Sequence, residues 1–122
     1  MTPEQRALVA DAISVYKQIR ADIPAALPVW PLGLPGWTDP WIALGLRGRE
    51  KTCATVWRRP AEESAAEQML PMPHLLGHDV DVSVLFPHGT KAAIDRSAER
   101  GELAVHLPEA GTACLIAMDW KP

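Results

Sequence analysis

The stretch Pro28–Leu46, PVWPLGLPGWTDPWIALGL, separates a helical pattern on its N-terminal side from a series of short strand patterns on its C-terminal side. Five of the twelve prolines lie between Pro24 and Pro40. Because proline fixes φ and lacks a backbone N–H, this region disfavours both helix and central strand. The sequence therefore predicts an N-terminal helix over 1–23, a connector over 24–40 and a β-sandwich domain over 41–122.

The residues before the connector have a helical period. The Thr-Pro-Glu-Gln sequence at 2–5 matches a helix start with a capping box. The apolar stripe consists of Leu8, Ala12, Tyr16, Ile19 and Ile23, widened by Val9 and Ile13. Because Pro24 cannot continue the helix, we expect its last residue at Asp22 or Ile23. One amphipathic helix is predicted.

Short apolar or alternating runs with turn residues between them follow the connector. They predict strands at 41–46, 51–58, 66–70, 79–86, 91–95, 102–107 and 112–118. Residues 60–70 and 90–100 also have good helix propensity, and the strand assignment there rests on their neighbours. About seven strands at roughly ten-residue spacing are typical of an antiparallel, Greek-key-like sandwich, so the fold class is mainly β.

Alternation within these runs predicts which side chains face the core. Val80, Val82, Val84 and Phe86 are expected to face inward, with Asp79 and Asp81 outward. Thr52, Ala54 and Val56 are expected to share the face opposite Cys53. The nearly all-apolar run 112–118 predicts a strand buried on both faces.

Composition excludes several classes of partner. The formal charge of −3 and the pI near 5.7 give no reason to expect nucleic acid or an anionic membrane. No charged-then-apolar leader is visible and no apolar run approaches about 18 residues, so we expect a cytoplasmic protein without membrane partners. No dinucleotide, P-loop or zinc-site spacing occurs, and no cofactor or metal is predicted.

Candidate chemical residues are few. Cys53 and Cys114 lie in strand-like runs and are interpreted as small buried thiols, with a disulfide as the alternative. Asp79 and Asp81 have a spacing that could suit a glycosidase carboxylate pair, but their regular alternation favours a solvated face. Histidines also occur, at positions 74 and 78 among others, and are interpreted as loop residues. No catalytic residue is predicted.

Tryptophan is the other candidate. Trp30, Trp37 and Trp57 could stack on sugar rings, because flat aromatic faces suit pyranoses. The connector indoles Trp30, Trp37 and Trp41 could equally anchor an irregular segment to the core, which is the favoured interpretation. Burial distinguishes the two: indoles exposed together in a groove favour sugar binding, and buried indoles favour the anchor role.

Several motifs together resemble a known family. They are Val15–Arg20 (VYKQIR), Trp30–Trp37 (WPLGLPGW), Trp41–Leu46 (WIALGL), Val56–Arg59 (VWRR), Leu70–Pro73 (LPMP), Val84–Pro87 (VLFP) and Glu102–Val105 (ELAV). The set resembles the end of family 36 glycoside hydrolases, the α-galactosidases or melibiases. The WPLGLPGW run is its most specific part.

The resemblance implies a function and a partner. That family has a (β/α)8 catalytic barrel, whose two aspartates hydrolyse terminal α-galactosides with retention, followed by an antiparallel β domain. The chain is then expected to be the last barrel helix and the non-catalytic β domain, with the catalytic aspartates before Met1. The helix stripe would pack on that barrel or, where the barrel is absent, would fold back on the β domain or pack against another copy of the chain. The alternative is a stand-alone carbohydrate-binding module.

Overall fold

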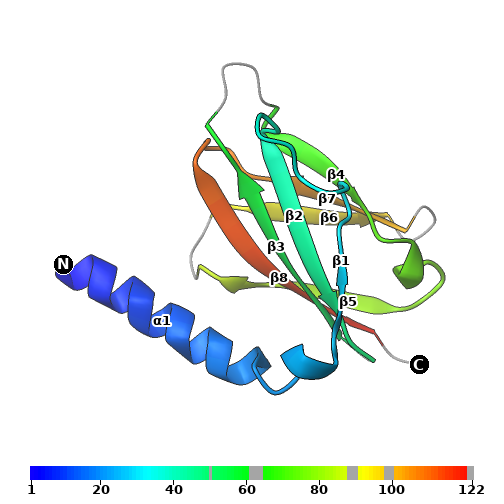
Figure 1. Ribbon diagram of the computed structural model, residues 1–122, viewed down its shortest axis with the longest axis horizontal. Helices are drawn as coiled ribbons and strands as arrows, with labels where there is room; N and C mark the ends of the chain where they lie inside the picture. The colour runs from blue at the N-terminus through cyan, green and yellow to red at the C-terminus, as the bar shows by residue number, and fades with distance from the viewer. Residues whose placement is uncertain (50, 61–64, 88–90, 98–100, 121–122) are drawn as a thin grey trace.

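The computed structural model describes residues 1–49, 51–60, 65–87, 91–97 and 101–120. Two antiparallel sheets face each other, and a helix extends from one side (Figure 1). The helices are α1 (Pro3–Ile19) and the 3-10 helices η1 (Ile23–Ala25) and η2 (Pro73–Leu75). The strands are β1 (Leu27–Val29), β2 (Trp41–Arg47), β3 (Lys51–Arg58), β4 (Glu67–Pro71), β5 (Val80–Phe86), β6 (Ala93–Ser97), β7 (Glu102–His106) and β8 (Thr112–Trp120).

Sheet A contains five strands in the order β1-β2-β3-β8-β5, and sheet B contains three in the order β4-β7-β6. The mainly β fold, a sandwich preceded by one helix, is confirmed. Seven of the eight described strands correspond to predicted ones, and the strand that was not predicted is β1. Pro28 excludes this segment from a central position but not from the sheet edge, where one side of the strand needs no partner. Opposite it, Gly45 leaves room for Val29, whose Cγ2 would lie 2.6 Å from a Cβ at that position.

The core lies between the two sheets. Sheet A contributes Trp41, Ala43, Ala54, Val56, Cys114, Ile116 and Met118, and sheet B contributes Leu70, Leu103 and Val105. Met72 and Leu75 belong to the same cluster and come from η2 and the residue before it. Strand β8 is central, between β3 and β5, and Ile116–Met118 are consecutive buried residues, as its apolar sequence predicts.

The strand boundaries follow the predictions closely, with one shift. Strand β3 has the predicted bounds, and its buried residues alternate as expected. The strand predicted at 91–95 lies at Ala93–Ser97. Residues 61–64 and 98–100, which fall in the two segments with good helix propensity, lie outside the described residues.

Phe86 lies on the face opposite to the predicted one. Val84 pairs with Ile116, but Phe86 pairs with Leu115, so the register shifts between them. The extra residue is a β-bulge, which reverses the alternation that placed Phe86 with Val80. Phe86 therefore lies beneath α1 and outside the inter-sheet core.

The helix start is confirmed and its end is corrected. Thr2 accepts from the Gln5 backbone N–H, and the Gln5 side chain accepts from the Thr2 N–H at 2.9 Å. The helix ends at Ile19, several residues before the predicted end. Pro24 has no N–H to donate to residue 20, and its ring would collide with that carbonyl, so the chain tightens into η1.

Candidate functional site

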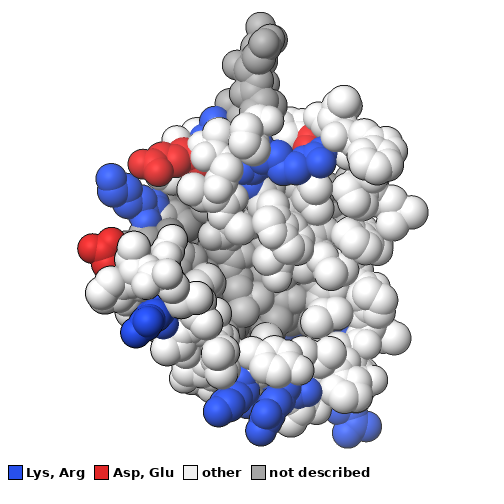
Figure 2. Space-filling view, turned by 60° about the vertical axis from the view of Figure 1, so that its left-hand side comes forward, with Lys and Arg blue, Asp and Glu red and all other residues white. Residues whose placement is uncertain are grey.

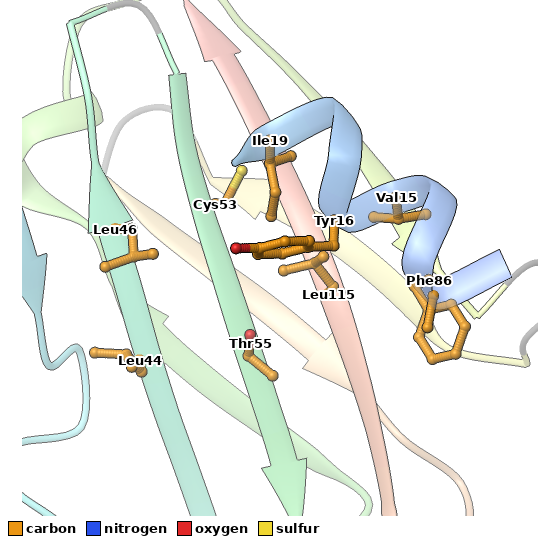
Figure 3. Close-up of a pocket in the computed structure, with 10 residues that line it drawn as sticks. Val15, Tyr16, Ile19, Leu44, Leu46, Cys53, Thr55, Phe86 and Leu115 are labelled. Atoms are coloured by element: carbon orange, nitrogen blue, oxygen red, sulfur yellow. The ribbon is translucent and has the colours of Figure 1, made fainter. Parts of the chain in front are cut away.

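Helix α1 packs on the outer face of sheet A, the face turned away from sheet B. Its buried residues, Val15 and Ile19, both lie in its C-terminal half. Between helix and sheet lies an apolar hollow of about 200 Å³ (Figure 3), into which Tyr16 extends from the helix toward β3. The hollow is lined by Ala12, Val15, Tyr16, Ile19, Leu44, Leu46, Cys53, Thr55, Phe86 and Leu115.

Most of the predicted helix stripe is not covered. Leu8, Val9, Ile13 and Tyr16 are 46–55% exposed. In Figure 1 the N-terminal half of α1, which carries Leu8 and Val9, extends away from both sheets. Ile13 and Tyr16 lie in the C-terminal half of the helix and are half exposed there, and Tyr16 borders the hollow above the sheet. The buried side of the helix centres on Val15, which the predicted stripe omitted. Its spacing of four from Ile19 was the signal available in the sequence.

The three sugar-stacking candidates lie around a second part of the same sheet face. Trp30 (39% exposed) and Trp57 (37%) line a shallow hollow of about 280 Å³ together with Pro35, Ile42, Leu44 and Arg59. Trp37 is 98% exposed and borders an adjoining hollow that shares Ile42 and Arg59. The anchor interpretation is therefore wrong for Trp37.

Trp41 does anchor the chain. It is buried in the core, and its indole N–H donates to the Ala65 carbonyl at 3.0 Å. The connector itself is held by Arg59, whose Nε donates to the Asp39 carbonyl at 2.7 Å and whose guanidinium also donates to the Gly36 carbonyl at 2.9 Å. Because these bonds occupy donors of Arg59, its main role is to fix the loop.

The two hollows share Leu44 and adjoin each other. We call the surface that they form the apolar face: it runs from Tyr16 and Leu46 past Leu44 to Ile42, Trp30 and Trp57. Figure 2 shows a side of the molecule that is hollowed at its centre and mostly uncharged, with Lys and Arg along its lower edge. Contiguous exposed apolar surface of this kind marks an interaction site in soluble proteins.

The carboxylate candidates do not form a glycosidase pair around a cleft. Asp79 and Asp81 are exposed, and Asp81 pairs across the sheet with Asp119 of β8. Both lie on the outward side predicted for them.

No group of three or more His, Cys, Asp or Glu among the described residues could hold a metal ion. No described helix is long and apolar enough to cross a membrane.

The two cysteines are free thiols on different faces of sheet A. Cys114 belongs to the inter-sheet core, whereas Cys53 lines the hollow beneath α1. Burial raises the pKa of Cys114 to about 11. Burial also raises the pKa of Cys53. There the positive charge of Lys51 opposes the shift, and the negative charges of Asp119 and Asp22 add to it. Both thiols are therefore protonated and poor nucleophiles at neutral pH.

His74 closes one end of the sandwich. Its Nε2 lies 3.0 Å from the hydroxyl of Thr52, which is fully buried, and its ring meets Trp120 edge to face at 5.7 Å. Burial, and then the positive charge of Arg47 and the neighbouring His78, lower the pKa of His74 below its ordinary 6.5. The prediction of a loop histidine missed this packing role, since the partners are 22 and more residues away.

This environment makes stability depend on pH. Since the pKa of His74 is lower in the folded chain, the unfolded chain binds the proton more readily, and stability falls as pH drops through 6.5 toward the folded pKa. We expect the urea midpoint to decrease over that window and His74→Gln to flatten the decrease. His106→Gln, at the opposite end of β4 from η2, is the matched control and should leave the slope in place. An unchanged slope in His74→Gln would contradict this assignment.

Comparisons of the chain with protein-family models, with curated proteins and with solved structures found no match. The resemblance to family 36 therefore rests on the sequence motifs and stays a prediction.

Proposed function

We propose that this chain is a non-catalytic C-terminal β domain of an α-galactosidase-like glycoside hydrolase, and that α1 packs against the catalytic barrel. The observation that carries the proposal is the helix stripe: Leu8, Val9, Ile13 and Tyr16 are about half exposed although α1 is capped and regular. A barrel helix needs an apolar stripe along its whole length because it packs on the strand layer inside it.

The chemistry of the chain agrees with an accessory role. The candidate carboxylates Asp79, just before the edge strand β5, and Asp81, within it, are both exposed. The raised pKa values of Cys53 and Cys114 keep these thiols protonated. The proposed domain contributes packing surface, while the barrel contributes the nucleophile and the acid/base. Its effect on the enzyme would be on stability and assembly.

The test combines the purified chain with a family 36 barrel produced without its last helix and its β domain. Binding to the folded barrel stabilises it by about 2.7 kcal/mol when the chain is at a hundredfold excess over its Kd, which corresponds to a rise of roughly 5 °C in the barrel's Tm. Leu8→Asp with Ile13→Asp should abolish the rise. Ala10→Asp with Ser14→Asp, on the exposed opposite side of α1, is the matched control and should retain it.

Two results would contradict the proposal. One is a barrel Tm that the chain leaves unchanged. The other is turnover of an aryl α-galactoside by the chain alone that is lost on Asp79→Asn or Asp81→Asn, which would make the chain itself catalytic.

A second candidate function, carbohydrate binding, is favoured by one specific observation. Trp30, Trp37 and Trp57 are all exposed and border adjoining hollows. The side chains around them are mainly apolar, and N–H donors of Arg59 are already bonded to backbone carbonyls of the connector. Calorimetric titration with galactosides, using Trp57→Ala as the variant and Leu76→Ala as an exposed apolar control, measures this directly. Heat that disappears only in Trp57→Ala would support it, and the absence of heat would exclude it.

A further inference from the structure

The connection from β4 to β5 joins the two sheets, because β4 belongs to sheet B and β5 to sheet A. Residues 72–78 of this connection include η2, and we call them the end segment. Met72 and Leu75 are buried in the inter-sheet core, and the Met72 N–H donates to the Gly101 carbonyl at 2.6 Å. Three further backbone hydrogen bonds run within the end segment. It can therefore detach as a unit without breaking the pairing of the strands.

A side-chain hydrogen bond ties the end segment to sheet A. Nε2 of His74 lies 3.0 Å from the hydroxyl of Thr52, and Thr52 is fully buried. Within the part of the chain that the structure describes, that hydroxyl has no other hydrogen-bond partner. Because a buried hydroxyl hydrogen without an acceptor is costly, Nε2 is the acceptor and carries no proton. The neutral ring then holds its proton on Nδ1.

A second proton on the His74 ring breaks this arrangement. With both ring nitrogens protonated, Nε2 can only donate, and the hydroxyl hydrogen of Thr52 loses its acceptor. The charged groups that act on the ring are Arg47 at the end of β2 and His78 in the end segment, and both oppose an imidazolium. Arg47 pairs with Thr52 across β2 and β3, so the two side chains share one face of sheet A.

Two further elements contribute to the surroundings of His74. From β8, the neutral indole of Trp120 meets the ring edge to face at 5.7 Å. From β6, Arg96 brings another positive charge, because its guanidinium donates to the Leu75 carbonyl at 3.3 Å and to the His78 carbonyl at 2.5 Å. The closed end segment therefore favours the neutral ring, whereas water accepts either form.

We propose that mild acid opens the end segment as one unit, while the strands of both sheets stay paired. Opening places the ring of His74 in water, where its pKa is the ordinary 6.5, whereas in the closed segment its pKa is lower. Between these two pKa values, each unit by which the pH falls raises the ratio of open to closed molecules by up to about tenfold. The loss of stability in acid then begins at this end of the molecule. The inference does not depend on the catalytic barrel, so the barrel experiment can succeed or fail without it.

Native-state hydrogen exchange of the full chain, followed by NMR, tests where the opening occurs. After correction for intrinsic exchange rates, the amides of Met72, Leu75 and His78 should be at least about tenfold less protected than those of the central strand β3. Low urea should lower the protection of β3 and leave that of the three amides unchanged, because local opening exposes little surface. Acid below pH 6.5 should lower the protection of the three amides by up to about tenfold per pH unit. If the three amides followed β3 through the urea series, or did not respond to pH, the proposal would be overturned.

Two variants and the ring spectrum separate this role from a merely structural one. His74→Gln retains an acceptor for the Thr52 hydroxyl but cannot titrate, so the pH dependence of the three amides should disappear. His106→Gln is the matched control and should keep it. The nitrogen-15 shifts of the His74 ring at about pH 8 should show an unprotonated Nε2. A protonated Nε2, or a pH dependence that persists in His74→Gln, would contradict the proposal. If His74→Gln does not fold, the ring spectrum and the urea series decide, since both use the unmodified chain.

Discussion

Replacement of both Val15 and Ile19 by aspartate is expected to release α1 from sheet A and to unfold it while the sandwich remains folded. Full burial of an apolar side chain contributes about 1.5–3 kcal/mol, so the two changes remove up to roughly 3–6 kcal/mol of docking. An isolated helix of this length is marginal in water, and α1 contains several β-branched residues. Far-UV circular dichroism should lose most of its helical signal.

The matched control places the same charges at the same spacing on the solvent side. Ser14→Asp with Gln18→Asp adds two aspartates four residues apart at exposed positions. We expect that variant to keep the helical signal and the hydrogen-exchange protection of residues 3–19. If the Val15 and Ile19 changes also left α1 protected, the helix would be held by contacts other than its docking on sheet A.

The second large effect concerns the core between the sheets. Leu103 lies in the central strand of sheet B and is fully buried, and Leu→Ala changes at such sites lower the free energy of unfolding by about 2–5 kcal/mol. We expect urea denaturation of Leu103→Ala to show a loss in this range with an unchanged m-value.

Leu76→Ala makes the same chemical change at a residue that is half exposed, and it should cost under about 1 kcal/mol. Equal losses in the two variants would mean that the inter-sheet cluster does not form the stability core. A fall in m-value for Leu103→Ala would instead indicate a change in compactness.

Strand positions could be predicted where alternation is undisturbed. Strand β3 was placed with its bounds and faces because each second residue of Thr52–Val56 is buried between the sheets. Alternation failed at Phe86, because a bulge inserts one residue and the pattern carries no sign of it. The edge strand β1 was missed because Pro28 excludes a central strand, and pattern alone does not identify which edge is free to accept it.

The candidate site was only partly accessible from sequence. The helix stripe and the tryptophans were identifiable as candidates from residue type and spacing, but the exposure of the tryptophans was not. That Ile42, Leu44 and Trp57 connect them into one surface depends on the pairing of β2 with β3, which is a long-range property. The position of Trp37 was predicted wrongly because a proline-rich segment with several indoles suggests anchoring, whereas Arg59 supplies the anchoring through the backbone carbonyls of Gly36 and Asp39.

The central claim is that the exposed apolar stripe of α1 is an interface for a catalytic barrel. The Tm of a family 36 barrel produced without its last helix and its β domain, measured with and without the chain, tests this most directly. The account predicts a rise of roughly 5 °C when the chain is at a hundredfold excess over its Kd, and no rise with the Leu8→Asp and Ile13→Asp variant. An unchanged Tm with the unmodified chain, in which residues 3–19 form α1, would contradict it.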